Sequence, residues 1–333
     1  MKHSYYIIVP AYNEERTLSA FFESIARAVK FADKQFTLEK TYICINGCTD
    51  KTEQIAKILQ KTLSVLKINI LYSEKGMNKA LCTIISKLEK SDIPIIKVDA
   101  DVQLSRSSIH ILLNELCRHP ELLIVGGHPF ARQFSGESFL RTLLARMIDI
   151  RSRYPLSQVA TKDVSSYHEL ALVDPQPNMP YTFELRSRIY FHGRFYVLRN
   201  KDIWRVPPDR IGDDTYLTLD VYSRFGRNSI RIRYDAACFY EPTTSLKEYW
   251  KVYKRIFCDT YTLFMLPEFQ TDNLIDVKNK IAVKLDWDYI RSLPLRIQLT
   301  FIGYVIIKKT SNLLFHISPK YNDNLWTYER KIH

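Results

Sequence analysis

Residues 93–101 carry the pattern that decides the fold, and they read Ile93-Pro94-Ile95-Ile96-Lys97-Val98-Asp99-Ala100-Asp101. A short apolar run of this kind predicts a buried strand, and it ends here in two carboxylates. In an extended chain Asp99 and Asp101 point to the same face. Because like charges repel each other, a divalent cation would relieve this pair, and Mg²⁺ or Mn²⁺ prefers carboxylate oxygens. The simpler alternative is an acidic surface turn.

The chain on both sides of this stretch alternates between strand-like and helix-like patterns. Five apolar runs predict strands, at Tyr5–Val9, Thr41–Ile45, Ile68–Tyr72, Ile93–Val98 and Leu122–Val125. Between them apolar residues recur at helical spacing, as Leu18, Phe21, Phe22 and Ile25 do. This alternation predicts an α/β fold with a mostly parallel sheet flanked by helices. Ligands of such sheets bind beyond the carboxyl ends of the strands, so the loops there are the expected site.

The pattern loosens after Gly126-Gly127. A helix is predicted between Phe139 and Ile148, and the prolines between 175 and 180 indicate a loop. Late strands are predicted at Arg194–Leu198 and Ile230–Tyr234, and the chain from Ser245 onward is basic and mainly helical in pattern.

Three other polar segments are candidates for chemistry, and each has a structural alternative. In Pro10–Glu15, Asn13 could cap a helix, and in Ile45–Thr52 either Thr49 or Asp50 could do so, with Glu53 closing a capping box. The adjacent acids Asp213 and Asp214 precede a short helical pattern and could also cap it. A carboxylate there could instead serve as a general base, given an acceptor hydroxyl within hydrogen-bond reach.

Composition narrows the classes of protein that are possible. The chain has 333 residues and six scattered cysteines without a CxxC pair, which favours a reducing compartment over a disulfide framework or a zinc site. A net charge of +12 favours polyanionic partners, yet no nucleic-acid module is present, so no nucleic acid is expected. The apolar run Phe301–Ile307 ends at two lysines and is far shorter than a membrane span. We therefore expect a cytoplasmic protein.

The order and spacing of the motifs resemble glycosyltransferase family 2 over roughly residues 4 to 257. Pro10-Ala11-Tyr12-Asn13-Glu14 is similar to the opening motif of the family, and Asn46–Thr52 to its Asp-Gly-Ser-Thr-Asp-Gly-Thr segment. Lys75–Leu81 resembles its Gly-Lys-x-x-Ala-Leu-Asn loop. Asp99-Ala100-Asp101 matches the DxD motif, Asp213-Asp214 the late acidic pair, and His192–Arg199 the strand before that pair.

The resemblance implies a GT-A fold and an inverting, metal-dependent transfer of a hexose from a nucleotide-sugar, with UDP favoured. It implies a catalytic domain over residues 1–242, with a nucleotide-binding half to about 127 and an acceptor-binding half from about 128. A basic, mainly helical region would follow over 243–333. The acceptor would be a hydroxyl of a saccharide or glycolipid, such as a cell-envelope glycan, and the cofactor would be Mn²⁺ or Mg²⁺.

The resemblance also implies residue roles. Asp214, with Asp213 beside it, would be the catalytic base, and Asp101 would bind the cation on the diphosphate. Asp99 would contact the ribose or metal-bound water, and Asn46 would sit where an aspartate usually accepts the uracil N–H. The remaining positions expected to bind the nucleotide-sugar are Pro10, Ala11, Tyr12, Glu14 near the ribose, Asp50, Lys75, Asn78 and Arg255.

Two departures from the family pattern matter. Asn46 replaces the usual carboxylate, and its amide brings a donor as well as an acceptor, which loosens the case for uridine over guanosine or thymidine. The Gln-x-x-Arg-Trp motif of processive members is reduced to Arg255 within Val252–Ile256, which argues against a polymer-extruding synthase. Arg255 could contact the diphosphate or simply be one more basic residue on a helix face.

Aromatic and basic residues alternate at helical spacing from Trp250 to Phe264. The favoured interpretation is a helix packed on the catalytic domain. The alternative is an anionic membrane surface, which would place the protein peripherally on the inner face of the membrane. Two other functions stay open. One is a catalytically silent nucleotide-sugar-binding or scaffold protein, which the retained acids oppose. The other is a nucleotidyltransferase, which would want a Gly- and Arg-rich loop after the first strand. His128 and His192 receive no catalytic role.

Overall fold

The computed structural model describes residues 3–132, 139–154, 191–270, 274 and 285–317. Its centre is one eight-stranded sheet in the order β3-β2-β1-β4-β7-β6-β8-β5. The strands are β1 (His3–Ala11), β2 (Phe36–Asn46), β3 (Ile68–Ser73), β4 (Ile95–Val98), β5 (Val102–Leu104), β6 (Ile124–Ala131), β7 (Phe195–Leu198) and β8 (Ile230–Tyr240). The first half, β3-β2-β1-β4, is parallel, and β7 runs antiparallel between β4 and β6. The predicted α/β class with a mainly parallel sheet is confirmed, with β7 and β5 as antiparallel members.

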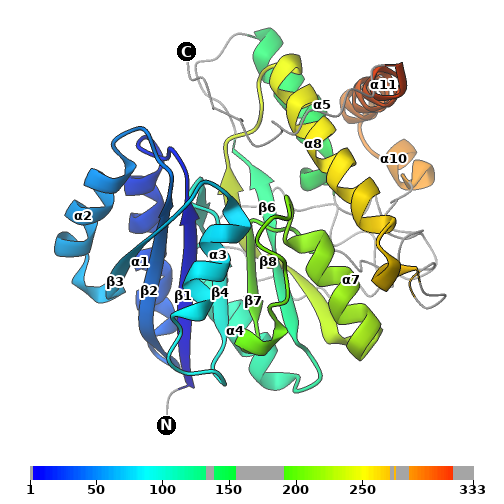
Figure 1. The fold of residues 1–333 in the computed structure, drawn as a ribbon. Helices are drawn as coiled ribbons and strands as arrows, with labels where there is room; N and C mark the ends of the chain where they lie inside the picture. The colour runs from blue at the N-terminus through cyan, green and yellow to red at the C-terminus, as the bar shows by residue number, and fades with distance from the viewer. Residues whose placement is uncertain (1–2, 133–138, 155–190, 271–273, 275–284, 318–333) are drawn as a thin grey trace.

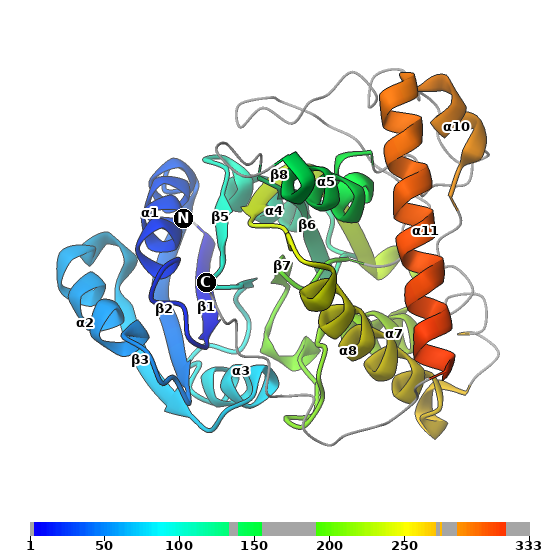
Figure 2. The ribbon, with the colours of Figure 1, turned by 90° about the horizontal axis from the view of Figure 1, so that it is seen from above.

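The helices lie on both faces of the sheet and at one of its ends (Figure 1). They are α1 (Leu18–Ala32), α2 (Thr52–Thr62), α3 (Met77–Ser86), α4 (Ser108–Arg118), α5 (Phe139–Arg153), α7 (Asp214–Phe225), α8 (Leu246–Phe264), α10 (Trp287–Ser292) and α11 (Leu295–Ile317). Figure 2 shows α8, α10 and α11 at the end of the sheet opposite to α2 and β3.

Strand β1 explains why the sheet has a hydrophobic core on each side. Successive strand residues point to opposite faces. Tyr5, Ile7 and Val9 accordingly join the core formed with α1 and α4, whereas Tyr6 and Ile8 join the core formed with α3 and α7. A strand buried on both faces is a continuous apolar run, which is the pattern that predicted it.

Several predicted boundaries are corrected by the structure. Strand β2 begins at Phe36 and β8 continues to Tyr240, while β4 begins only at Ile95. Strand β5 was not predicted, because it has three residues and pairs with β8 far along the chain. In α5, Phe139 and Leu140 are 78% and 74% exposed, although the predicted apolar face of this helix contained them.

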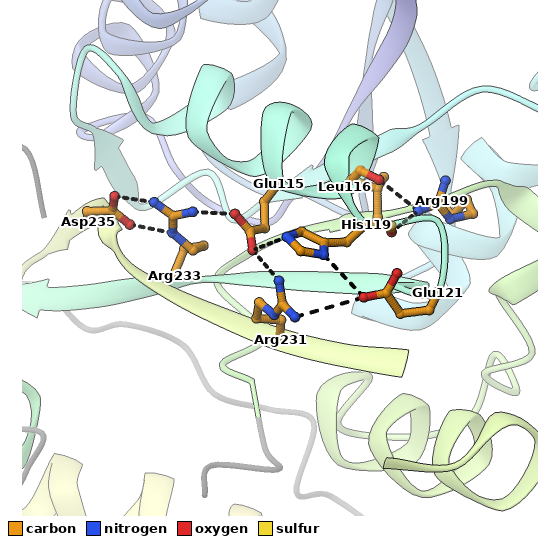
Figure 3. A network of polar contacts seen from close by, with 8 residues as sticks. All are labelled: Glu115, Leu116, His119, Glu121, Arg199, Arg231, Arg233 and Asp235. Carbon is orange, nitrogen blue, oxygen red and sulfur yellow. Dashed lines mark hydrogen bonds and ion pairs between the residues drawn. The ribbon is translucent and has the colours of Figure 1, made fainter. Parts of the chain in front are cut away.

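An ion network on the α4 side of the sheet fixes that helix to β8 (Figure 3). The buried Glu115 carboxylate accepts hydrogen bonds from Arg231 at 2.6 Å and from Arg233, which also pairs with Asp235. Arg199, just after β7, donates to the carbonyls of Leu116 and His119 at the end of α4. Buried charges are tolerated only when they are paired in this way.

Helix α11 packs against α5. Phe301 and Tyr304 of α11 are buried, and Arg151 of α5 donates to the Tyr304 hydroxyl at 2.8 Å. At Gly303 the two helices approach so closely that a Cβ would lie 2.7 Å from the Met147 side chain. In the part of the chain that the structure describes, no helix is both long and apolar enough to cross a membrane.

Candidate active site

The loops after β1 and β2 brace each other at the carboxyl edge of the sheet. The Asn13 side chain accepts the Thr49 N–H at 2.8 Å, and Glu14 N–H donates to the Thr52 hydroxyl at 2.7 Å. Asp50 accepts the N–H groups of Glu15 at 3.1 Å and of Thr52 at 3.0 Å. Two of the predicted segments are therefore brought together.

The helix caps that were considered as structural alternatives are only partly present. Asn13 does not cap α1, which begins at Leu18, and its backbone adopts a left-handed φ of 54° inside the loop. Asp50 does bind the first N–H of α2, but Glu53 pairs with Lys57 and Tyr72 instead of closing a capping box. Asp213 makes no side-chain cap at α7, because its carboxylate is used elsewhere.

The remaining predicted nucleotide-binding positions include Lys75, Tyr12, Asn46 and Asn78, and of these Asn78 has the most different surroundings. Lys75 lies with its ammonium 4.6 Å from the centre of the Tyr12 ring, and Pro10 and Ala11, which precede Tyr12, are buried. Asn46 ends β2 with its side chain buried. Asn78 is different, because it is fully buried and donates at 2.8 Å to the Arg210 carbonyl, on the loop that leads to Asp213.

The two acidic pairs meet across the turn before β7. Asp99 N–H donates to the Arg194 carbonyl at 2.9 Å, and Gly193 N–H donates to Asp214 at 2.8 Å. A Cβ on Gly193 would lie 3.0 Å from oxygens of both Asp213 and Asp214, so a side chain at Gly193 would crowd this contact. The sequence placed Asp99 and Asp214 in separate segments, and the antiparallel pairing of β4 with β7 joins them.

Three side chains that the sequence did not single out complete the cluster. Lys97 is fully buried, with its ammonium 2.6 Å from Asp99 and 3.5 Å from Asp213. The Tyr196 hydroxyl donates to Asp213 at 2.6 Å. The guanidinium of Arg194 lies 3.8 Å from the centre of the Tyr240 ring. The sequence signal that could have identified this cluster was the position of Lys97 inside an apolar strand.

Charge balance sets the protonation of this cluster. Burial disfavours an ammonium, but the charges of Asp213 and Asp99 more than offset it and hold the pKa of Lys97 above its usual value. Burial raises the pKa of Asp99, the Lys97 charge opposes that rise, and the Asp101 charge adds to it. These carboxylates therefore favour the protonated form of Lys97.

A fifth acid, Asp259 on α8, lies close enough to Asp214, the candidate base, to interact with its charge. Its carboxylate accepts the Gly212 N–H at 3.1 Å, and burial, with a further contribution from the Asp214 charge, raises its pKa to about 6. The predicted Arg255 is half-buried one turn earlier on the same helix. Helix α8 thus reaches the loop that carries Asp213 and Asp214.

Replacing Asp259 by Asn is expected to stabilise the protein at high pH. The folded carboxyl binds its proton more tightly than an unfolded one, whose pKa is about 3.9, so folding becomes less favourable as pH rises from about 4 through 6. Asn removes that cost, so the free energy of unfolding at pH 8 should rise by about 1–2 kcal/mol. Urea unfolding at pH 8 and pH 4.5 measures it, and the gain should shrink at the lower pH.

The exposed Asp209, on the loop that also carries Gly212, is the matched control for that experiment. Its change to Asn should leave the stability within about 0.5 kcal/mol of the wild type at both pH values. An Asp259→Asn protein that is less stable than the wild type at pH 8 would contradict the prediction.

The acids after β4 suit a hard cation as a partial ligand set. Among the described residues, no group of three or more His, Cys, Asp or Glu side chains could hold a metal ion. Asp101 and Asp99 supply carboxylate oxygens only, which fits Mg²⁺ or Mn²⁺ because these ions take few protein ligands and complete their shell with phosphate and water. A cavity of about 210 Å³ opens beside Asp101, and Arg16, Arg132 and Glu241 are among the residues that line it.

This sheet, with one acidic pair after β4 and a second brought against it before α7, is the architecture of a GT-A glycosyltransferase. The model of glycosyl transferase family 2 matches residues 6–172, which is half of the chain. The protein therefore belongs to that family, and membership supports a nucleotide-sugar-dependent glycosyltransferase.

The chain is similar to several solved structures, and the first of them, with a TM-score above 0.5, agrees on the fold. The mannosyltransferase PcManGT from Pyrobaculum calidifontis, solved with GDP-Man and Mn²⁺, is 14% identical with a TM-score of 0.59, covering 94% of this chain and 76% of that one. Glucosyl-3-phosphoglycerate synthase from Mycobacterium tuberculosis is 16% identical with a TM-score of 0.48, covering 80% and 81%. TarS 1–349 from S. aureus is 15% identical with a TM-score of 0.46, covering 96% and 93%. A search of curated protein sequences gives no match.

Proposed function

We propose that the protein is an inverting, divalent-cation-dependent glycosyltransferase that moves a hexose from a nucleotide-sugar to an acceptor hydroxyl. The observation that carries the proposal is the junction of the two acidic pairs through Gly193 and Arg194. A donor-side carboxylate and the proposed base are thereby linked through two neighbouring residues of one turn. Positioning of this kind is what a displacement at the anomeric carbon requires.

In this reaction Asp214 accepts the proton of the acceptor hydroxyl, whose oxygen forms the new bond to the anomeric carbon. The bond from that carbon to the diphosphate breaks, and its electron pair leaves with the nucleoside diphosphate. A cation held by Asp101 would supply neutralising charge at the diphosphate. The loops of Tyr12 and Asn46 would hold the nucleoside, and Glu14 would lie near the ribose.

UDP is the favoured nucleotide, and the acceptor would be a saccharide or glycolipid. Calorimetry with UDP, GDP and dTDP, each with and without Mn²⁺, tests the proposal. Tight, Mn²⁺-dependent binding of one of them, followed by transfer from its sugar, is the expected result. No binding by folded protein would overturn the proposal and favour a silent scaffold.

The exposed apolar residues of helix α11 suggest a further partner for the protein. Leu295, Leu299, Ile302, Ile306 and Leu313 of α11 are all exposed and recur at three- or four-residue steps or their sum. They therefore form one apolar stripe on the helix, which is rimmed by the exposed Arg296 and Lys309. We propose that this stripe rests on an anionic lipid surface, because basic charges beside an apolar face complement such a surface.

Replacing Ile302 and Ile306 together by Glu is expected to abolish flotation with phosphatidylglycerol vesicles, which the wild type should show. The loss should be about tenfold or more, since two apolar anchors are replaced by charges of the wrong sign. Ile256→Glu on α8 is the control, since Ile256 is equally exposed but lies off the stripe. Wild type that stays unbound, or that forms a dimer through this stripe in sedimentation, would contradict the proposal.

A further inference from the structure

Lys97 is a buried lysine whose ammonium contacts one acid of each acidic pair, Asp99 and Asp213. It lies in β4, opposite Tyr196 of β7, and its side chain is 1% exposed. Its ammonium lies 2.6 Å from Asp99 and 3.5 Å from Asp213, and it also donates to the Gly193 carbonyl. Two of these contacts are hydrogen bonds, to Asp99 and to the Gly193 carbonyl, and the contact with Asp213 is an ion pair.

The contacts of Lys97 continue to Asp214 through one peptide. Gly193 accepts from Lys97 through its carbonyl and donates from its N–H to Asp214 at 2.8 Å. The Tyr196 hydroxyl donates to Oδ2 of Asp213 at 2.6 Å, and the same oxygen lies nearest to the Lys97 ammonium. A shift of the ammonium would therefore move the donor-side acid and the acceptor-side acids together.

The charge of Lys97 also competes with any cation that approaches Asp99. Asp99 makes a direct ion pair with the Lys97 ammonium, so a second cation is repelled at close range from the same carboxylate. Asp101 borders the cavity beside α1, and the Arg194 charge acts on both Asp101 and Asp99.

We propose that Lys97 is the positioning residue that sets the spacing between the donor-side and acceptor-side acids, and that its charge competes with a divalent cation at the acids after β4. The inference rests on the function proposed above. It predicts that loss of the Lys97 charge moves two properties in opposite directions. Transfer should fall because the acids lose their common anchor, and cation binding should tighten because a competing charge has gone.

The test replaces Lys97 by Met, which keeps the length of the side chain and removes its charge. Transfer is expected to fall about 100-fold, the size of effect that small misplacement of catalytic groups produces. The dissociation constant for Mn²⁺ without nucleotide, measured from the paramagnetic resonance signal of free Mn²⁺, is expected to fall roughly tenfold. Lys201→Met, which removes a lysine hydrogen-bonded to the Leu88 carbonyl, should change neither.

The outcomes distinguish the proposed role of Lys97 from a purely structural role and from failure of the proposed function. Lys97→Met protein with transfer within threefold of the wild type would overturn the inference, as would loss of transfer together with equally weakened Mn²⁺ binding. If this variant does not fold, Lys97→Gln takes its place, because it also lacks the charge but keeps a hydrogen-bond donor. Its Mn²⁺ binding should still tighten roughly tenfold, and unchanged Mn²⁺ binding would overturn the inference. Wild type inactive with every nucleotide-sugar would instead refute the proposed function itself.

Discussion

Asp214→Asn is expected to lower the rate of sugar transfer about a thousandfold while donor binding stays within about threefold of the wild type. Asp214 accepts the N–H groups of Gly193 and Thr215, each at 2.8 Å. An amide of the same shape keeps one of these hydrogen bonds but cannot take a proton from an acceptor hydroxyl. Initial transfer rates, with calorimetry of nucleotide binding on the same preparation, measure the two quantities separately.

Asp220→Asn is the matched control for this change, because Asp220 lies on the same helix and pairs with Arg224 instead of the cluster. It should retain transfer within about threefold, since its effect is limited to local stability. Retained turnover in the Asp214 variant would remove this residue as the base. The second acid of the pair, Asp213, would not inherit the role directly, because Tyr196 and Lys97 already occupy its carboxylate.

Asp101→Ala is expected to abolish the dependence of donor binding on Mn²⁺. Nucleotide affinity in the presence of Mn²⁺ should fall about 100-fold, to the level that the wild type shows without metal, because the diphosphate charge is no longer neutralised at this position. Calorimetric titration of the favoured nucleotide, with Mn²⁺ and with a chelator, gives all four affinities. Metal-dependent binding that persists unchanged would refute the assignment of Asp101.

A neutral change at Asp50 gives the comparison for this experiment. Asp50 uses its carboxylate on the N–H groups of Glu15 and Thr52, so Asp50→Asn should weaken nucleotide binding similarly with and without metal. Only the Asp101 variant is expected to alter the ratio of the two affinities.

The local sequence pattern was sufficient to predict the strands in the parallel half of the sheet. Runs such as Tyr5–Val9 are apolar on both faces because helices cover both sides of the sheet, and that burial is visible in the residues themselves. Strand β5 escaped prediction because three residues carry too little pattern, and its existence depends on a partner strand more than a hundred positions away. The exposed start of α5 was misjudged because the same periodicity does not say whether another element covers it.

The candidate site divides in the same way. Segments with chemical character, such as Asp99-Ala100-Asp101 and Asp213-Asp214, were identified from residue types and from their position at strand ends. Asn78 was assigned to the nucleotide-sugar from its motif, and only the structure shows that its amide also donates to the Arg210 carbonyl. Lys97, Tyr196 and Asp259 were missed, because a lysine or tyrosine in a strand and an aspartate in a helix have ordinary surface explanations.

The sequence by itself determined the family, the order of the elements and the edge of the sheet where the acids would lie, because these follow from short-range periodicity and from motif spacing. Only the tertiary structure decided which acids share one electrostatic environment. Strand β7 carries Tyr196 against Lys97 and brings Gly193 to Asp214, while α8 brings Asp259 to Gly212. Burial of a charge and its pairing depend on distances between segments remote in the chain, and no local pattern encodes those distances.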